Sequence, residues 1–294
     1  MPKLVNLKIN PLLWMVLASL FFSIMAGIVK SLEHLPTWEI VFFRAFINLV
    51  WLLPWAFRDP LYSWRKEWPA LLTRGVSGWV SLVLYFYALE HMRLADAVML
   101  NHTSPIIVLL LSFFVLHERI TPVAVMFVGL ALVGVAFILK PSFEFSGADA
   151  VSLGGIAGFA SALTSAVAYV SLKVATRSIS TTSIVVTFAG VASVLSFVPM
   201  VMHYVPPTPK EWLLLFLCGT FATAAQATMT KSYSLLPASV ASPLSLLNVL
   251  FSALIGLAIW SEIPDNWSIF GSVLIVIGVI GSSRSKARRT TRAV

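Results

Sequence analysis

Residues 94–118 read LADAVMLNHTSPIIVLLLSFFVLHE, and similar apolar runs recur along the whole chain. Such a run is long enough to cross a bilayer, because the ~30 Å hydrocarbon core needs roughly 20 mostly apolar helical residues. A polar cluster from Asn101 to Ser104 interrupts this one, and Pro105 then removes a backbone hydrogen-bond donor. A helix broken at membrane depth is tolerated where it lines a cavity. The stretch therefore predicts a membrane-spanning helix with a polar break.

Ten runs of this kind divide the chain, separated by short breaks that contain turn-forming residues such as proline and aspartate. The runs are 11–30, 38–57, 71–89, 95–116, 121–140, 151–173, 182–204, 211–233, 238–260 and 266–283. They are continuously apolar rather than alternating, which excludes the pattern of a membrane β-barrel. We therefore predict an all-α polytopic membrane protein with ten transmembrane helices.

The composition supports this class of protein. Of 294 residues, 59% are hydrophobic and 11% are charged, and the mean hydropathy is +0.91. Soluble proteins carry about 25% charged residues, so the composition excludes a water-soluble enzyme, a disordered protein and a nucleic-acid-binding module. Cys218 is the single cysteine, which excludes an intrachain disulfide and a multi-cysteine metal site. We predict neither a metal nor a cofactor.

Lysine and arginine collect on one side of the ten predicted spans. Fifteen lie on that side: Lys3, Lys8, Arg58, Arg65, Lys66, Arg74, Arg119, Lys173, Arg177, Lys231, Arg284, Lys286, Arg288, Arg289 and Arg292. The other side holds four: Lys30, Arg93, Lys140 and Lys210. Because basic residues are enriched on the cytoplasmic side, we predict that both termini are cytoplasmic. The basic segment 284–294 would be a cytoplasmic tail that contacts lipid headgroups.

The N-terminal run 11–30 is too long for the apolar core of a signal peptide, and no small-residue cleavage site follows it. It is therefore interpreted as the first membrane span.

The chain repeats itself at a spacing of about 143 residues. The matching positions are Ser19, Ser23 and Lys30 with Ser161, Ser165 and Lys173, and Glu118 with Glu262. We therefore divide the chain into repeats 11–140 and 151–283, each with five predicted spans. An odd number inverts the second repeat relative to the first, and inverted repeats are typical of secondary transporters with a site between the halves. Val249 replaces the proline of the first repeat, which predicts that the two halves differ chemically there.

Short motifs in a fixed order extend over essentially the whole chain. They are Phe43-Arg44, Arg74-Gly75, Tyr87-Ala88-Leu89, Leu94-Ala95-Asp96-Ala97, Thr103-Ser104-Pro105, Glu118, Lys231-Ser232-Tyr233, Pro237-Ala238-Ser239, Pro243-Leu244 and Glu262. In this order they resemble the EamA-type proteins of the drug/metabolite transporter superfamily. The resemblance implies ten helices in two inverted halves, a bacterial inner-membrane location and transport of small metabolites. Relatives mostly export amino acids and related amphiphilic compounds, whereas some take up metabolites such as S-adenosylmethionine or riboflavin.

Polar side chains within the spans are the candidate substrate contacts, because such groups face a partner, a cavity or water rather than lipid. The candidates are Ser23, Trp79, Tyr85, Asn101, His102, Ser165, Tyr169, Gln226 and Asn248. Serines spaced by four residues also suit close helix packing, so packing and cavity lining both stay open. It is equally open whether Gln226 and Asn248 contact each other or a substrate. Trp79 and Tyr85 would supply an aromatic wall for a flat or cationic substrate.

Four further residues are interpreted as structural: Arg44, Pro105, Glu118 and Glu262. Arg44 would bond helix-end carbonyls or another span, and the two glutamates would cap a helix or bond across a loop. All twelve acidic residues fall at span ends or in loops of this assignment. His102 is then the titratable group well inside a span that could change charge near neutral pH. We predict no buried carboxylate relay.

A secondary transporter is the leading hypothesis. An intramembrane enzyme would need convergent catalytic motifs, and an ATP-driven pump would need a phosphate-binding loop; the sequence contains neither. We therefore predict no catalytic residues. The partners would be a small-molecule substrate and the lipid bilayer, without nucleic acid. Export is favoured, and uptake, the substrate and the choice between monomer and homodimer stay open.

Overall fold

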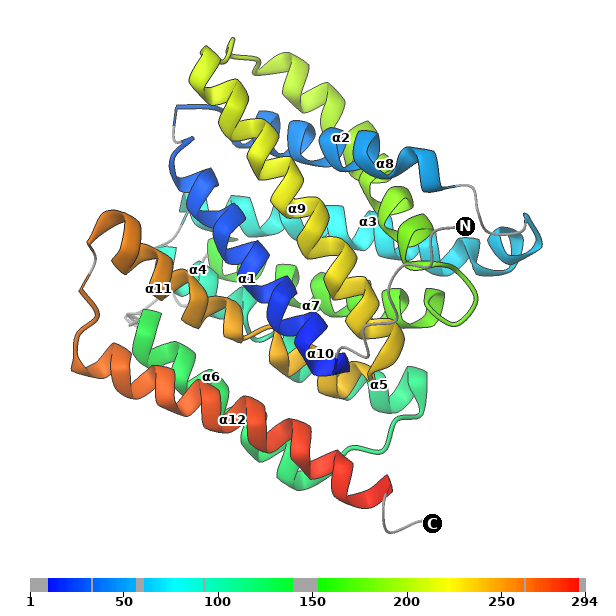
Figure 1. Ribbon diagram of the computed structural model, residues 1–294, viewed down its shortest axis with the longest axis vertical. Coiled ribbons are helices and arrows are strands. Elements are labelled where there is room, and N and C mark those ends of the chain that lie inside the picture. The colour runs from blue at the N-terminus through cyan, green and yellow to red at the C-terminus, as the bar shows by residue number, and fades with distance from the viewer. Residues whose placement is uncertain are drawn as a thin grey trace.

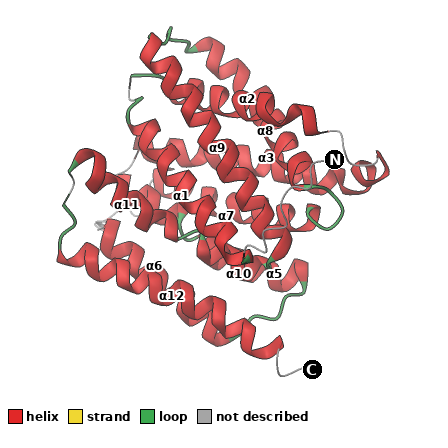
Figure 2. Cartoon of the chain, in the orientation of Figure 1, coloured by secondary structure: helices red, strands yellow, loops and turns green. Residues whose placement is uncertain are grey.

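The chain folds into a bundle of helices, seen in the computed structural model, which describes residues 10–32, 34–56, 61–91, 94–139, 153–261 and 263–290. Within these residues the helices are joined by short loops and no strand occurs (Figure 2). In chain order the first repeat holds α1 (Pro11–Lys30), α2 (Thr37–Ala56), α3 (Leu61–His91), α4 (Leu94–Asn101), α5 (Ser104–Leu116) and α6 (Pro122–Leu139). The second holds α7 (Leu153–Ala175), α8 (Thr181–Met202), α9 (Pro209–Leu235), α10 (Ala238–Leu244), α11 (Leu247–Trp260) and α12 (Asn266–Thr290).

Ten membrane-crossing segments account for these helices. Nine segments of the described chain are long and apolar enough to cross a membrane, and α4 with α5 and α10 with α11 each count as one of them. The tenth predicted span, 71–89, lies within α3. This helix begins at Leu61, ten residues before the predicted span, because a helix can continue beyond its apolar part. Glu67, placed in a loop by the sequence, is therefore a buried residue of α3.

The helices of the two repeats pack in reciprocal pairs. The closest neighbours are α3 with α7 and α1 with α9, together with α2 with α8 and α6 with α12. Figure 1 shows α6 and α12 side by side along one edge of the bundle, and α1 beside α9. In the contact of α1 with α9, the first helix of the first repeat packs on the third helix of the second. A two-fold axis then requires the third helix of the first repeat to pack on the first helix of the second, and α3 does contact α7. The pairing is that of two inverted five-helix repeats.

Backbone geometry repeats with the same spacing. Two residues other than glycine in the described chain have positive φ, His117 at 54° and Ser261 at 55°. Each follows a helix of the fourth span of its repeat, and their backbone N–H groups donate to the carbonyls of Ser112 and Gly256. Both pairs are 144 residues apart, since 261 − 117 and 256 − 112 give the same difference. The two spans therefore end in the same left-handed cap.

Both of these spans are broken within the membrane-crossing segment. The first breaks at His102 and Thr103, just before Ser104 and Pro105 begin α5. The second breaks at residues 245–246, although the sequence comparison found no proline at the equivalent of Pro105. Pro243 lies two residues before that break. The replacement of proline by Val249 therefore does not change the backbone path. Pro105 follows the break in the first repeat, and Pro243 precedes the equivalent break in the second.

Small residues bring α6 and α12 into backbone contact. A Cβ atom built on Gly134 would lie 2.5 Å from the carbonyl oxygen of Gly271, and one built on Gly271 would lie 2.5 Å from that of Gly134. In contrast, a Cβ on Gly129 of the same helix would meet nothing within 4 Å. Close approach through small residues is a common way for membrane helices to associate.

We expect Gly134→Leu to destabilise the protein and Gly129→Leu to leave it nearly unchanged. The larger side chain at position 134 forces the helices apart, and overpacking of this kind costs roughly 1–3 kcal/mol. Thermal unfolding of the purified variants in detergent measures the difference. Equal melting temperatures for the two variants would contradict the described packing of α6 on α12.

Candidate functional site

A cavity of about 1220 Å³ lies between the two repeats. Its wall includes residues from α1, α2, α3, α4 and α6 of the first repeat and from α7, α8, α9, α11 and α12 of the second. Ligand pockets in proteins typically have about 300–1,000 Å³, so this volume admits a metabolite of substantial size. Because both repeats contribute to the wall, their relative movement would change the shape of the cavity.

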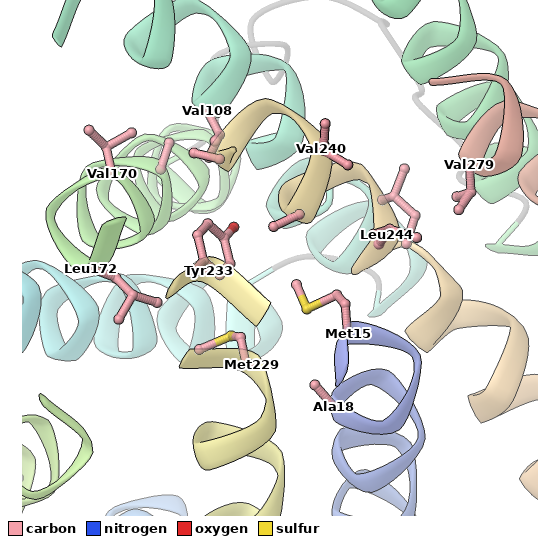
Figure 3. Close-up of a cluster of buried hydrophobic side chains, with 14 of the residues drawn as sticks. Met15, Ala18, Val108, Val170, Leu172, Met229, Tyr233, Val240, Leu244 and Val279 are labelled. Atoms are coloured by element: carbon pink, nitrogen blue, oxygen red, sulfur yellow. The ribbon is translucent and has the colours of Figure 1, made fainter. Parts of the chain in front are cut away.

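The cavity is closed at one end by a cluster of buried apolar side chains. Met15 of α1, Val108 of α5, Tyr233 of α9, and Val240 and Leu244 of α10 converge there (Figure 3). Along α1, α7 and α9 the cluster lies beyond the lining residues, on the side where α1 begins and α7 and α9 end. These contacts join helices from both repeats, so opening this end would require the repeats to separate there.

The opposite end reaches the surface. Lining residues at this end include Lys30 at the end of α1, Thr37 at the start of α2, and Ile263 and Asp265 just before α12. Lys30 and Asp265 are exposed, and Ile263 is 85% exposed. The cavity is therefore accessible from the face that carries the α1–α2 and α11–α12 connections and is closed from the other face.

Most of the residues singled out in the sequence line this cavity. Eight do so: Ser23, Tyr85, Asn101, His102, Ser165, Tyr169, Gln226 and Asn248. Trp79 does not line it, and its indole N–H donates to the Ser196 hydroxyl at 3.0 Å. The expected aromatic wall of Trp79 and Tyr85 is thus not formed, because Trp79 lies on a different face of α3 and contacts α8.

The serines of α1 and α7 combine the two roles that were left open. Ser23 lines the cavity, and its hydroxyl donates to the side-chain and main-chain oxygens of Asn248, at 2.5 and 2.9 Å. On the other side the Asn101 amide donates to the Ser161 hydroxyl at 3.0 Å. Each contact joins the first helix of one repeat to the broken span of the other. The serines therefore pack helices together and hold the asparagines at the cavity wall.

Gln226 and Asn248 do not bond each other. The Gln226 side-chain oxygen accepts a hydrogen bond of 3.2 Å from Nη2 of Arg74, a residue that the sequence analysis assigned to the cytoplasmic edge. Because α3 begins at Leu61, Arg74 lies well inside the helix; it is 4% exposed and lines the cavity. Its guanidinium carbon lies 4.1 Å from the centre of the Phe188 ring. The Arg74-Gly75 motif marked this residue in the sequence. Its position inside the membrane span was missed because the predicted helix start was ten residues too late.

Arg44 was expected to bond helix-end carbonyls or another span, and it also lines the cavity. In the described chain its one side-chain hydrogen-bond contact is Nη1 to the Met25 sulfur, at 3.7 Å. The charged side chains of the lining are Lys30, Arg44, Arg74 and Asp265. The cationic groups therefore outnumber the acid, which gives the cavity a net positive charge.

Two glutamates, Glu118 and Glu39, accept hydrogen bonds from backbone N–H groups of distant segments, and for Glu118 a helix cap or a bond across a loop was expected. Its carboxylate accepts from the backbone N–H groups of Ala238 at 2.8 Å and Ser239 at 3.1 Å, and from the Ser239 hydroxyl. It thus caps α10 of the other repeat. Glu39 is fully buried, but it lies at a span end as expected, in the first turn of α2, where it accepts from the N–H of Val205 at 3.1 Å. Glu262 lies outside the described residues.

Comparisons with known proteins agree with this architecture. The EamA-like transporter family matches residues 9–140 and, a second time, residues 152–284. The pseudopaline exporter CntI of Pseudomonas aeruginosa is 36% identical over 92% of this chain and 95% of its own. The S-adenosylmethionine uptake transporter of Rickettsia prowazekii is 22% identical over 91% of this chain and 90% of its own. A crystal structure superposes with a TM-score of 0.83 at 21% identity, covering 95% and 98% of the two chains.

We expect Glu118→Gln to lower the melting temperature more than Glu211→Gln does. Both glutamates accept from a backbone N–H at the start of a helix, but the Glu118 bonds are partly buried and join the two repeats, whereas the Glu211 bond is exposed and local. Replacing the carboxylate by a neutral amide removes its charge-assisted hydrogen bonds. A hydrogen bond to a charged group contributes about 1.5–3 kcal/mol to stability. Thermal unfolding in detergent measures both variants. An equal decrease would show that the contact with α10 adds nothing beyond an ordinary surface cap.

Proposed function

The chain belongs to the EamA-like transporter family, and we propose that it exports a small metabolite across the bacterial inner membrane by alternating access. The substrate would be an amino acid or a related amphiphilic compound. The observation that carries this proposal is the cavity, which is lined by both repeats, open at one end and closed at the other. Rocking of two inverted repeats about such a site exchanges the open end for the closed one.

The names of two relatives bear on the proposed direction of transport, which is export. The P. aeruginosa relative at 36% identity is an exporter by name, whereas the R. prowazekii relative at 22% is an uptake carrier. Uptake is therefore the second candidate function. A carrier of this kind is reversible in principle, so the direction follows from the driving gradient rather than from the fold.

The orientation proposed from the charge distribution places both termini in the cytoplasm. In Figure 1, α1 begins and α12 ends toward the same side of the bundle, as this orientation requires. The accessible end of the cavity would then face the periplasm, and the apolar cluster with Met15 and Tyr233 would seal the cytoplasmic side. The structure would represent the state from which an exporter releases its substrate.

The site residues have distinct proposed roles. Asn101, His102 and Asn248 lie at the cavity wall beside the breaks of the two interrupted spans, and their polar side chains would contact the substrate. Tyr85 and Tyr169 add phenol groups to the wall, and Tyr169 stacks on Tyr233 of the closing cluster, with ring centres 5.7 Å apart. A substrate that displaces Tyr169 would therefore act directly on the closed end.

We expect Ala253→Trp to abolish export and Ala258→Trp to preserve it. Both residues are on α11, but Ala253 lines the cavity and Ala258 is exposed on the outside of the bundle. The indole of the first variant would occupy volume that the substrate needs. Metabolites inside and outside cells that express either variant, wild type or no transporter are compared by mass spectrometry.

At least one compound should increase in the medium and decrease in cells with wild type and Ala258→Trp. Its distribution should return to that of transporter-free cells with Ala253→Trp. A compound that accumulates inside instead would favour uptake. Indistinguishable distributions in all four strains, or full activity of Ala253→Trp, would contradict the proposed site.

A further inference from the structure

We propose that Arg44 and Arg74, with Gln226, form an oxyanion subsite in the cavity, and that the transported compound is an amphiphilic organic anion bound through a carboxylate. This inference rests on the proposed function and adds the chemical class of the substrate. It also changes the role of Arg44, which the sequence had suggested was structural.

The guanidinium of Arg74 is held in place on two sides. Nη2 donates to the Gln226 side-chain oxygen at 3.2 Å, and the Phe188 ring covers one face at 4.1 Å. Both contacts come from the second repeat, whereas Arg74 belongs to the first. A planar guanidinium fixed in this way is suited to the bidentate recognition of a carboxylate.

The charge of Arg74 has no acidic partner within the described part of the chain. The titratable groups that act on it electrostatically are two tyrosines, Tyr169 and Tyr233, and the like-charged Arg44. Its Nε–H is buried and makes no hydrogen bond to any described residue. A buried charge without a counter-charge is costly, and within membrane-spanning helices such residues commonly mark substrate pathways. An anionic substrate would offset this cost.

Space for the guanidinium depends on the absence of a side chain at position 78. A Cβ atom built on Gly78 would lie 2.4 Å from Nη1 of Arg74 and 2.9 Å from Cε2 of Phe188. Even alanine at this position would therefore displace the arginine from its present position. The glycine, one turn further along α3, keeps the charged group at the cavity wall.

Comparison of the two repeats shows that the fold itself does not require these arginines. With the spacing of 144 residues given by the caps at His117 and Ser261, Arg44 corresponds to Phe188 and Arg74 to Cys218. The second repeat therefore builds the same helices with uncharged residues at both positions. The positive charge belongs to one half of the cavity only, which favours a role in recognition over one in architecture.

The remainder of the wall is largely apolar and includes Phe22, Val41, Leu82, Phe86, Ile138 and Leu139. This combination suits a molecule with an apolar body and an anionic group. Carboxylates and phosphates share the oxyanion chemistry that arginine recognises. We favour a carboxylate because a single charge costs less to transfer from water into such a cavity than the double charge of a phosphate ester.

The test uses four probes with similar apolar bodies: 4-phenylbutyrate, the neutral 4-phenylbutyramide, the cationic 4-phenylbutylamine and 3-phenylpropyl phosphate. Melting temperatures of the purified full-length protein in detergent are measured over a concentration series of each. We expect 4-phenylbutyrate to stabilise wild type at concentrations at which the amide and the amine do not. Stabilisation by the phosphate alone, or equally by all four probes, would overturn the proposal.

The variants Arg74→Gln, Arg44→Gln and Gly78→Ala should each weaken 4-phenylbutyrate binding roughly tenfold or more, because each removes or displaces a charged donor. Arg119→Gln, which changes an exposed arginine in the α5–α6 loop, is the control and should bind as wild type does. If Arg74→Gln does not fold, the other two variants decide the result. Unchanged binding by both would overturn the proposal.

Failure of this inference can be distinguished from failure of the proposed function. If cells export a compound without an acidic group and Arg44→Gln exports it normally, the oxyanion subsite is wrong while the transporter proposal stands. If no compound is exported or taken up, the proposed function fails, and the probe titrations still decide whether the cavity binds carboxylates.

Discussion

Hydrocarbon supplies no hydrogen-bond partner for a polar group, and the arrangement of this chain follows from that constraint. Most backbone groups are satisfied within helices. At the two interruptions the backbone makes turn hydrogen bonds instead, such as that from the Thr103 N–H to the Leu100 carbonyl, and both breaks lie between the repeats, where other helices cover them. Ser23 and Ser161 bond the asparagines beside these breaks. The helix interruptions and the polar wall of the cavity are thus a single structural feature, because polar atoms at this depth must face each other or a substrate.

Duplication supplies this arrangement twice, and the side-chain differences between the copies make the cavity asymmetric. The left-handed caps at His117 and Ser261 show how closely the backbones agree. The side chains differ at the cavity, where Arg44 and Arg74 of the first repeat have Phe188 and Cys218 as counterparts. A symmetric scaffold with an asymmetric charge distribution can orient an amphiphilic molecule while keeping two related packings of the repeats. This combination is what an alternating-access carrier for a polar metabolite requires.

The sequence was sufficient for the architecture, and eight of the nine candidate contacts chosen from it line the cavity. Span length, apolar continuity and the repeat spacing predicted the helices, and midspan amides such as Gln226 were correctly expected to face the interior. Arg74 was missed because its helix extends ten residues beyond the apolar segment, so hydropathy placed the charge at the membrane edge. Trp79 was misassigned because single-helix periodicity does not show which neighbour a side chain meets. The burial of Glu39 depends on a loop far away in sequence, which no local pattern reveals.

The central claim is that one cavity between the repeats is reached alternately from the two membrane faces. Cysteine accessibility tests it most directly, because Cys218 is buried and can be replaced by serine. In that background a cysteine is introduced in place of the cavity residue Ala253. Intact cells and inside-out vesicles are then treated with a membrane-impermeant maleimide. The account predicts labelling in both preparations, with protection by the transported compound. Labelling from one face only, under all conditions, would contradict it.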